Sequence, residues 1–387
     1  MSIVRSCFLT LPSLLMCKQT GITKTVIMDI IEGRGPSFCI QKFVNYCNYD
    51  SRSSFALRCN CSLDEPVGEE FLSLVKECNA RRINVMLRVL WIVQQLLQEN
   101  RHASKRDIYY MHPSIFPDQL TVDRAINDIC ILLQCSRHQL NVVSVGNGLV
   151  MGWFRFTEGE RVFDCIRDPN TSHSIPVQVE DVTDLTNFAK YILVVEKESG
   201  YFFSGLALLI FTLILFHAVF QRLANDKFCT TNRCIVITGR GYPDISTRRF
   251  LRLLVEKFGL PVYCLVDCDP YGIDILTTYR FGSLQMSYDA KFLQVSQICW
   301  IGAFPSDVEK YGLPSRSLLP MTSEEKKRTE LILKRCYFQR DVPSWRDEVE
   351  LLLQSGMKFE IEALSVHSIS FLSDHYIPSK IRAFNVL

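Results

Sequence analysis

The chain has 387 residues, of which 48% are hydrophobic, so it is long enough to form two or three domains with buried cores. Its formal net charge of +2 at pH 7 neither requires nor excludes a polyanionic partner such as DNA, so any DNA affinity must come from local patches. Sixteen cysteines are scattered through the sequence without a C-x-x-C pair or a histidine at zinc spacing, which favours reduced buried thiols over a disulfide scaffold or a zinc site.

Residues 1–79 mix cysteines, charges and short apolar runs without sustained periodicity, and we expect them to form an N-terminal extension. An apolar patch from Phe8 to Met16 follows Arg5 and is similar to a signal peptide. Pro12 interrupts this patch and no small-residue cleavage pattern follows it, so secretion is not expected.

Apolar residues recur at helical spacing from Arg81 to Asn100 and from Thr121 to Gln134, which predicts two amphipathic helices. Between them, Ser104 and Asp107 are spaced like a capping box and predict the start of a short helix.

Two β-rich runs, Leu140–Val145 and Leu149–Phe156, follow these helices. The residues Gly146, Asn147 and Gly148 that join them tolerate positive φ, which predicts a hairpin. Three helices followed by a hairpin are typical of a winged helix-turn-helix domain, here residues 80–160, although an unrelated small α+β module has the same pattern.

After a linker, residues 161–189, strands and helices alternate through residues 190–387, which predicts a parallel sheet with crossover helices. The expected strands end at Glu196, Gly239 and Asp267, and the expected helices are Val219–Phe228, Thr247–Phe258, Ile273–Tyr279, Ser323–Arg335 and Trp345–Leu353. In such sheets, functional groups collect beyond the carboxyl ends of the strands. The predicted fold class is therefore α/β combined with α+β.

Three carboxylates occupy these strand ends. Asp267 and Asp269 are two residues apart and face one side if the backbone stays extended, and Glu196 ends another apolar strand. Three carboxylates at one rim repel each other unless a cation lies between them, and oxygen ligands of this kind suit Mg²⁺. The alternatives are a solvated turn for the aspartates and an ion pair with Lys197 or an arginine for Glu196.

A second candidate site lies in the run SKRDIYYMHP, residues 104–113. Tyr110 follows Tyr109, and Arg106 lies four residues before Tyr110, on the same face of a helix. A cation there stabilises a phenolate and neutralises a phosphate under attack. For an isolated Tyr-Tyr pair, core or interface packing is the more common role.

A third candidate is the glycine- and arginine-rich run TGRGYPDISTRRF, residues 238–250. Thr247 or Ser246 is expected to cap the following helix, whose start suits phosphate contact. We assign Arg240, Tyr242 and Arg248 as DNA contacts, with a solvated basic helix start as the alternative.

The runs KRDIYYMHPSIF, VVSVGNGLVMGW, ILVVEKE, VITGRGYPD, LVDCDPYGIDIL and KFEIEAL occur in this order over residues 80–380. Together they resemble the family of Spo11 and the A-type subunits of topoisomerase VI, in particular its plant members. The resemblance implies a winged-helix domain followed by a Toprim domain. It also implies that Tyr110 is the nucleophile, that Arg106 assists it, and that Glu196, Asp267 and Asp269 bind Mg²⁺.

The reaction implied by the resemblance is transesterification, in which Tyr110 attacks double-stranded DNA and leaves a 5′-phosphotyrosyl bond and a free 3′-hydroxyl. The family also implies a nuclear homodimer that initiates meiotic recombination, with a topoisomerase VI B-like ATPase partner and accessory meiotic proteins. The chain has no Walker-type phosphate loop, so ATP is expected to bind the partner.

One segment departs from the family pattern. Residues 199–218 separate VVEKE from VFQRL, which are almost contiguous in the family, and no charged residue occurs from Gly200 to Phe220. That length suffices to span a bilayer, but a span here would split a βα unit, so we expect no membrane association. Our hypothesis is an unspliced intron or a gene-model error, as for the first twenty or so residues. The alternatives are an inactive isoform, a non-cleaving DNA-binding scaffold protein, or a membrane-anchored protein.

Overall fold

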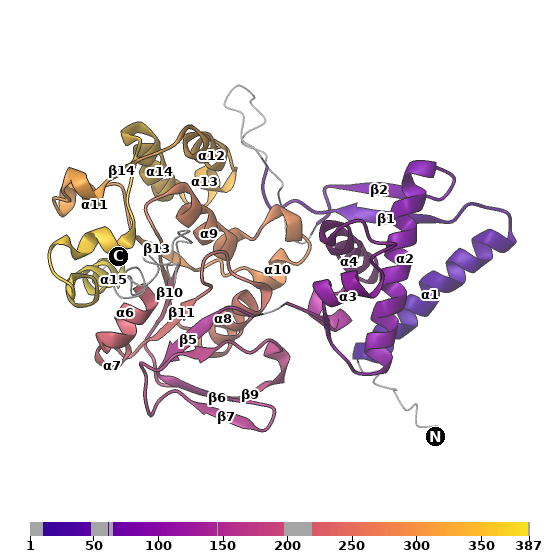
Figure 1. Ribbon diagram of the computed structural model, residues 1–387, viewed down its shortest axis with the longest axis horizontal. Coiled ribbons are helices and arrows are strands. Elements are labelled where there is room, and N and C mark those ends of the chain that lie inside the picture. Colours follow the sequence, from indigo (N-terminus) through magenta and orange to yellow (C-terminus); the bar gives the residue numbers. More distant parts are fainter. Residues whose placement is uncertain (1–10, 48–60, 62–64, 145, 197–218, 386–387) are drawn as a thin grey trace, which may run out of the picture. The chain divides into compact units, whose positions relative to one another are not determined.

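The computed structural model describes the chain except for residues 1–10, 48–60, 62–64, 145, 197–218 and 386–387 (Figure 1). The apolar insert at residues 199–218 therefore lies outside the described residues, as does the beginning of the N-terminal apolar patch. None of the helices in the described part of the chain has the length and apolar content needed to cross a membrane.

The described chain divides into two compact units. Unit 1 comprises residues 1–45, 62–145 and 284–292, and unit 2 comprises residues 46–61, 146–283 and 293–387. This division differs from the expected ranges 1–79, 80–160, 161–189 and 190–387. The expected linker carries three strands: β7 (Arg161–Asp164), β8 (His173–Ser174) and β9 (Val182–Asn187).

Unit 1 is mainly helical. Its helices are α1 (Leu11–Ile31), α2 (Glu77–Gln98), α3 (Lys105–Met111), α4 (Gln119–Leu133) and the short η2 (Arg137–Leu140) and η4 (Leu284–Met286). Helix α10 (Ala290–Leu293) ends at the boundary with unit 2. The three helices predicted from periodicity and capping are confirmed as α2, α3 and α4. Residues such as Ile83, Val89 and Val93 of α2 are fully buried, as the amphipathic pattern requires.

Helix α1 was not predicted, because residues 1–79 were expected to be an extension. Leu15 is 2% exposed in the core of unit 1, and Ile22 and Val26 pack against that core from the same helix. Lys18 Nζ also donates a hydrogen bond to the carbonyl of Leu133 in α4. Helix α1 is therefore part of unit 1.

The predicted hairpin is wrong. Strand β4 (Val142–Val143) pairs in parallel with β3 (Ala103–Ser104) in unit 1, whereas β5 (Leu149–Gly152) joins a sheet of unit 2. The consecutive residues Val150 and Met151 are both 0% exposed, and burial on both faces requires a covered sheet rather than a half-solvated wing. The antiparallel pair of unit 1 is instead β1 (Ser37–Lys42) with β2 (Gly68–Ser73).

Unit 2 contains the predicted parallel sheet. Its order is β13-β12-β10-β11-β5-β8, with β10 (Ile192–Val195), β11 (Ile235–Thr238), β12 (Val262–Leu265) and β13 (Cys299–Gly302) parallel and β5 and β8 antiparallel. All residues of the first three of these strands are buried, as continuous apolar runs predict for a sheet covered on both faces. A smaller sheet, β7-β6-β9, includes β6 (Phe154–Glu158), and β14 (Leu319–Pro320) pairs with β15 (Met357–Lys358).

The predicted helices of unit 2 are confirmed, the first of them as two pieces. The α-helices are α6 (Val219–Asn225), α7 (Phe228–Asn232), α8 (Ile245–Phe258), α9 (Pro270–Phe281), α11 (Asp307–Lys310), α12 (Ser323–Leu333), α13 (Tyr337–Arg340), α14 (Pro343–Ser355) and α15 (Ile377–Asn385). Short 3-10 helices are η3 (Val179–Asp181), η5 (Ser315–Ser317) and η6 (Ile361–Val366), and η7 (Leu372–Tyr376) is a π-helical turn.

The register of β10, β11 and β12 makes these parallel strands end at the same level of the sheet. Val195 lies opposite both Thr238 and Leu265, so Glu196 and the loops after β11 and β12 leave the sheet at one edge. This edge is where the sequence placed the candidate metal ligands.

Candidate functional site

Tyr110 lies at the exposed end of α3 in unit 1. The predicted capping box begins this helix: Asp107 N–H donates to Ser104 Oγ at 3.2 Å, and Ser104 N–H donates to Asp107 Oδ2 at 2.7 Å. Ile108 is fully buried and Tyr109 is half-buried against the core of unit 1. The rigid start and the buried side of α3 therefore fix the position of the residue that follows them.

The two tyrosines have different environments. Tyr110 is 67% exposed, and its ring meets that of Tyr109 edge-on with centroids 5.1 Å apart. Arg106 is exposed and lies one helical turn before Tyr110. A phenol in this position is accessible to a macromolecule, whereas Tyr109 serves the packing role that an adjacent tyrosine pair more commonly has.

Glu196 lies at the acidic edge of unit 2, where it contacts both neighbouring loops. Its backbone carbonyl accepts a 2.8 Å hydrogen bond from Gly241 N–H, in the loop after β11. Its carboxylate Oε2 accepts a 2.8 Å bond from Asp267 N–H, in the loop after β12. Glu196 is 2% exposed, so these contacts hold a carboxylate that is largely shielded from water.

Asp267 and Asp269 are also held by the backbone. Asp267 is 3% exposed, and its Oδ1 accepts a 2.9 Å bond from Ile361 N–H at the start of η6. Asp269 is half-buried and caps α9, where its Oδ1 accepts a 2.7 Å bond from Gly272 N–H. Glu196 and Asp267 are thus joined by a hydrogen bond at this edge, and Asp269 lies two residues further on at the start of α9, so their shared role as metal ligands stays a prediction.

Gly272 leaves space for this arrangement. A Cβ at this position would lie 2.8 Å from Glu196 Oε2 and 2.5 Å from the carbonyl oxygen of Asp267. The close approach of a carboxylate and a loop to α9 therefore requires glycine. The carboxylates of this edge offer oxygen ligands, the type that suits a hard divalent cation such as Mg²⁺.

The loop after β11 leaves two of the three residues expected to contact DNA exposed, and their role stays a prediction. Arg240 and Tyr242 are exposed, but Arg248 is 2% exposed, so its guanidinium does not face a ligand outside the protein. The cap of α8 is Asp244, whose Oδ1 accepts a 2.7 Å bond from Thr247 N–H, and not Thr247 or Ser246. Thr247 lies three residues after Asp244, inside the first turn of α8, so its N–H is one of the free donors that the cap accepts.

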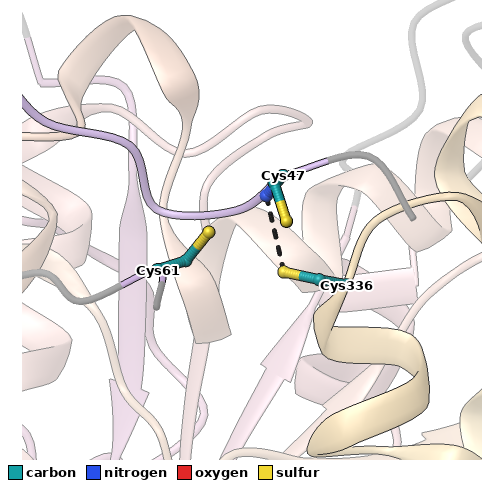
Figure 2. Close-up of side chains that lie close together, drawn as sticks. All are labelled: Cys47, Cys61 and Cys336. Carbon is teal, nitrogen blue, oxygen red and sulfur yellow. Dashed lines mark hydrogen bonds between the residues drawn. The ribbon is translucent and has the colours of Figure 1, made fainter. Parts of the chain in front are cut away.

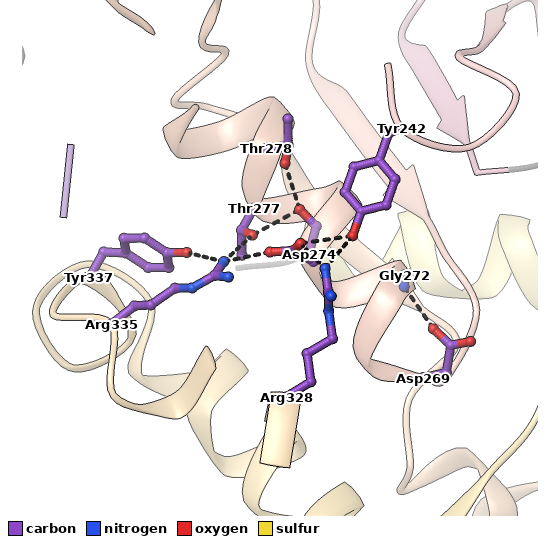
Figure 3. A network of polar contacts seen from close by, with 9 residues as sticks. All are labelled: Tyr242, Asp269, Gly272, Asp274, Thr277, Thr278, Arg328, Arg335 and Tyr337. Atoms are coloured by element: carbon purple, nitrogen blue, oxygen red, sulfur yellow. Dashed lines mark hydrogen bonds and ion pairs between the residues drawn. The ribbon is translucent and has the colours of Figure 1, made fainter. Parts of the chain in front are cut away.

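A polar network that was not predicted from the sequence lies next to the acidic edge (Figure 3). Asp274, on α9, forms ion pairs with Arg328 at 2.7 Å and with Arg335 at 2.6 Å. The Tyr242 hydroxyl donates to Asp274 Oδ2 at 2.8 Å and accepts from Arg328 at 2.7 Å. Burial, followed by the charge of Asp274, raises the pKa of Tyr242. These contacts connect the loop after β11 to α9 and α12.

Tight clustering of metal-ligating side chains occurs elsewhere. Within the part of the chain that the structure describes, one set of three cysteine, histidine or acidic side chains has ligand atoms within 4.8 Å of each other: Cys47, Cys61 and Cys336. The acidic residues of the edge are less closely spaced, as mutual repulsion favours. The cysteine cluster was not predicted, because its members are far apart in the chain.

The sequence matches two family models. Residues 213–381 match the Toprim domain of Spo11 and the A-type subunit of topoisomerase 6, and residues 81–142 match the model described as type IIB DNA topoisomerase. The first match contains Asp267 and Asp269, and the second contains Tyr110 and Arg106.

Curated relatives match over most of the chain. The chain is 61% identical over 368 residues to meiotic recombination protein SPO11-1 of Arabidopsis thaliana, covering 95% of each protein. It is 35% identical to meiotic recombination protein SPO11 of Mus musculus, covering 94% of this chain and 86% of the mouse protein. It is 34% identical to the A-type subunit of DNA topoisomerase 6 of Arabidopsis thaliana, covering 79% of this chain and 66% of that protein.

Proposed function

Because the chain belongs to the family of Spo11 and the A-type subunits of topoisomerase 6, we propose that it is the DNA-cleaving component that makes the double-strand breaks of meiotic recombination. It is a type IIB topoisomerase-like enzyme of the plant SPO11-1 type. The observation that carries the residue-level proposal is the 67% exposure of Tyr110 on a capped helix whose neighbouring tyrosine is packed.

Tyr110 is the proposed nucleophile. Its phenolic oxygen forms a bond to a DNA phosphorus, the bond from phosphorus to the 3′ oxygen breaks, and the departing 3′ oxygen receives a proton in place of the one lost by the phenol. The phenol needs help at neutral pH, since an unperturbed tyrosine has a pKa near 10. Arg106, one turn earlier on the same helix, supplies a positive charge that stabilises the phenolate and orients the phosphate.

Mg²⁺ is the proposed cofactor, since Toprim domains generally bind divalent metals and the donors here are carboxylates. Glu196, Asp267 and Asp269 would hold the ion. When bound, Mg²⁺ supplies positive charge that offsets charge on the phosphate. The chain itself holds Glu196 and Asp267 through backbone hydrogen bonds, which limits their movement when the charge at the site changes.

The proposed partners follow from the family. Double-stranded DNA is the substrate, with Arg240 and Tyr242 as exposed contacts, and two copies of the chain cut the two strands. A topoisomerase VI B-like ATPase and accessory meiotic proteins complete the machinery, which acts in the nucleus. We assign unit 1 as the winged-helix-like module that carries Tyr110, with β1 and β2 as its antiparallel pair.

Recovery of DNA linked to the protein tests this proposal. The full-length chain would be immunoprecipitated from meiotic cells under denaturing conditions, and covalently attached oligonucleotides would be labelled at their free 3′ ends. Linked DNA is expected from the wild type and from Tyr109→Phe, and none from Tyr110→Phe. Linked DNA from Tyr110→Phe would refute the nucleophile assignment, and its absence from the wild type would refute the cleavage function.

A further inference from the structure

Three cysteines from distant parts of the sequence meet in unit 2. The Sγ atoms of Cys47, Cys61 and Cys336 all lie within 4.8 Å of one another (Figure 2). Cys336 is buried and the other two are half-buried. Among the described residues, no other set of three cysteine, histidine or acidic side chains brings its ligand atoms this close together.

Backbone contacts hold two of the three residues together. The carbonyl of Cys47 accepts a 2.9 Å hydrogen bond from Cys336 N–H, and Cys47 N–H donates to Cys336 Sγ at 3.4 Å (Figure 2). An N–H donor directed at the sulfur orients this side chain as a possible ligand. Thiolates are the form in which cysteines bind metals.

We propose that Cys47, Cys61 and Cys336 bind a zinc ion. Thiolate sulfurs select soft or borderline cations such as Zn²⁺ over the Mg²⁺ suited to carboxylates. A tetrahedral ion with Zn–S bonds of about 2.3 Å places sulfurs about 3.8 Å apart, so the cysteines need to approach by only about 1 Å. Each neutral thiol that binds releases one proton to solvent, and no oxidant is involved.

The ion has a structural role in unit 2. Residues 46–61 belong to unit 2, whereas residues 1–45 and 62–145 belong to unit 1, and Cys47 and Cys61 lie at the two ends of this crossing segment. Cys336 immediately precedes α13. Tyr46 packs edge-on against Tyr337 of α13, with ring centroids 5.5 Å apart. A zinc ion therefore fastens both ends of the segment to α13, separately from the acidic edge.

Metal content of the full-length chain provides the first test. The protein would be purified with a non-thiol reductant and without chelators, and its metals counted by inductively coupled plasma mass spectrometry. About one Zn²⁺ per chain is expected. Replacing zinc with Co²⁺ should give an intense sulfur-to-cobalt charge-transfer band that excess Mg²⁺ does not remove, because carboxylates do not produce this band.

Single substitutions identify the ligands. We expect zinc affinity to fall more than about tenfold, and the cobalt band to weaken, in each of Cys47→Ser, Cys61→Ser and Cys336→Ser. Removing the hydrogen-bond partner of a metal ligand already lowers metal affinity about tenfold or more, and removing the ligand itself should lower it at least as much. Cys299→Ser is the matched control, because Cys299 is also half-buried in unit 2 but lies outside the cluster. Its zinc content should equal that of the wild type.

Several results would overturn the zinc site. The first is a wild-type chain that lacks both zinc and the cobalt band, or that holds copper instead. The second is retention of zinc by all three variants. The third is a disulfide between two of the three cysteines in a non-reduced digest. Cys336→Ser carries the greatest risk of misfolding, because Cys336 is buried. The wild-type metal count and the half-buried Cys61→Ser variant decide the question without it.

Discussion

The carboxylate of Glu196 accepts a 2.8 Å hydrogen bond from the backbone N–H of Asp267, so the ends of two neighbouring parallel strands are joined directly. This contact makes Glu196 both a proposed metal ligand and a fixed point of the loop after β12. The two roles can be separated, because a side-chain amide oxygen accepts the same hydrogen bond without carrying a charge.

Glu196→Gln should retain the fold and weaken divalent-metal binding. The loss of one buried negative charge is expected to lower Mn²⁺ or Mg²⁺ affinity on the order of 10- to 100-fold, with little change in the unfolding midpoint. Titration by calorimetry or by Mn²⁺ electron paramagnetic resonance measures the affinity. The control is Glu309→Gln, at an exposed carboxylate on α11. Equal metal affinity in both variants would contradict the role of Glu196.

Gly272→Ala should damage the same site through its shape. The added Cβ would meet Glu196 Oε2 at 2.8 Å and the Asp267 carbonyl oxygen at 2.5 Å, so α9 or the loop must shift. We expect a loss of about 1–3 kcal/mol of folding stability together with weaker metal binding. Chemical denaturation and metal titration measure the two effects. Gly146→Ala is the control, because its nearest neighbours lie at an ordinary 3.5 Å.

The acidic edge could be predicted because the features that define it can be read along the sequence. Buried parallel strands appear as continuous apolar runs, and their carboxyl ends share an edge, so Glu196 and Asp267 could be placed together without coordinates. Gly272 could not be singled out, because its importance depends on the approach of a side chain from the end of β10. The ion pairs of Asp274 with Arg328 and Arg335 likewise join helices that no sequence period connects.

Other features could not be predicted from the sequence because they depend on the path of the chain in space. The Gly-Asn-Gly run has the composition of a hairpin turn, yet the chain there passes from unit 1 to unit 2, as the pairing of β5 with β11 and β8 shows. The cysteine cluster combines positions 47, 61 and 336, whereas zinc motifs are recognised in sequence by short spacings. In α1, the helical spacing of Leu15, Ile22 and Val26 was present, but Pro12 precedes it and Gly21 interrupts it.

Asp274→Asn should destabilise unit 2 and remove part of its acid sensitivity. Burial alone raises the pKa of Asp274, but Arg335 and the hydrogen bonds from its neighbours outweigh burial, and the net pKa lies below its ordinary value of 3.8. The carboxylate therefore contributes stability that is present above that value and is lost as pH falls through the lower pKa of the folded protein. We expect the variant to lose about 3 kcal/mol at neutral pH, since two arginines lose their partner.

Denaturant unfolding between neutral pH and the acid range measures this contribution. The stability difference between the wild type and Asp274→Asn should begin to shrink as the pH falls below about 4, where the carboxylate of the unfolded chain becomes protonated, and should be lost at the lower pH where the folded protein's carboxylate becomes protonated. Asp341→Asn is a suitable control, because Asp341 pairs with the adjacent, partly exposed Arg340. A difference that stays constant with pH would show that the charge of Asp274 does not stabilise the fold.

Arg240 and Arg248 should differ in their effects on DNA binding, although both follow β11. Arg240 is exposed, so Arg240→Gln should leave stability within about 0.5 kcal/mol of the wild type. If its guanidinium contacts a phosphate, the slope of log affinity against log salt should become shallower by about 0.9. Arg248 is 2% exposed, so Arg248→Gln should lower the free energy of unfolding and leave the salt slope unchanged.

Fluorescence anisotropy with a DNA duplex at several salt concentrations measures the salt slope, and denaturant unfolding measures the stability. A shallower slope for Arg248→Gln would mean that α8 rearranges on DNA to expose this side chain, and an unchanged slope for Arg240→Gln would remove Arg240 from the DNA contacts.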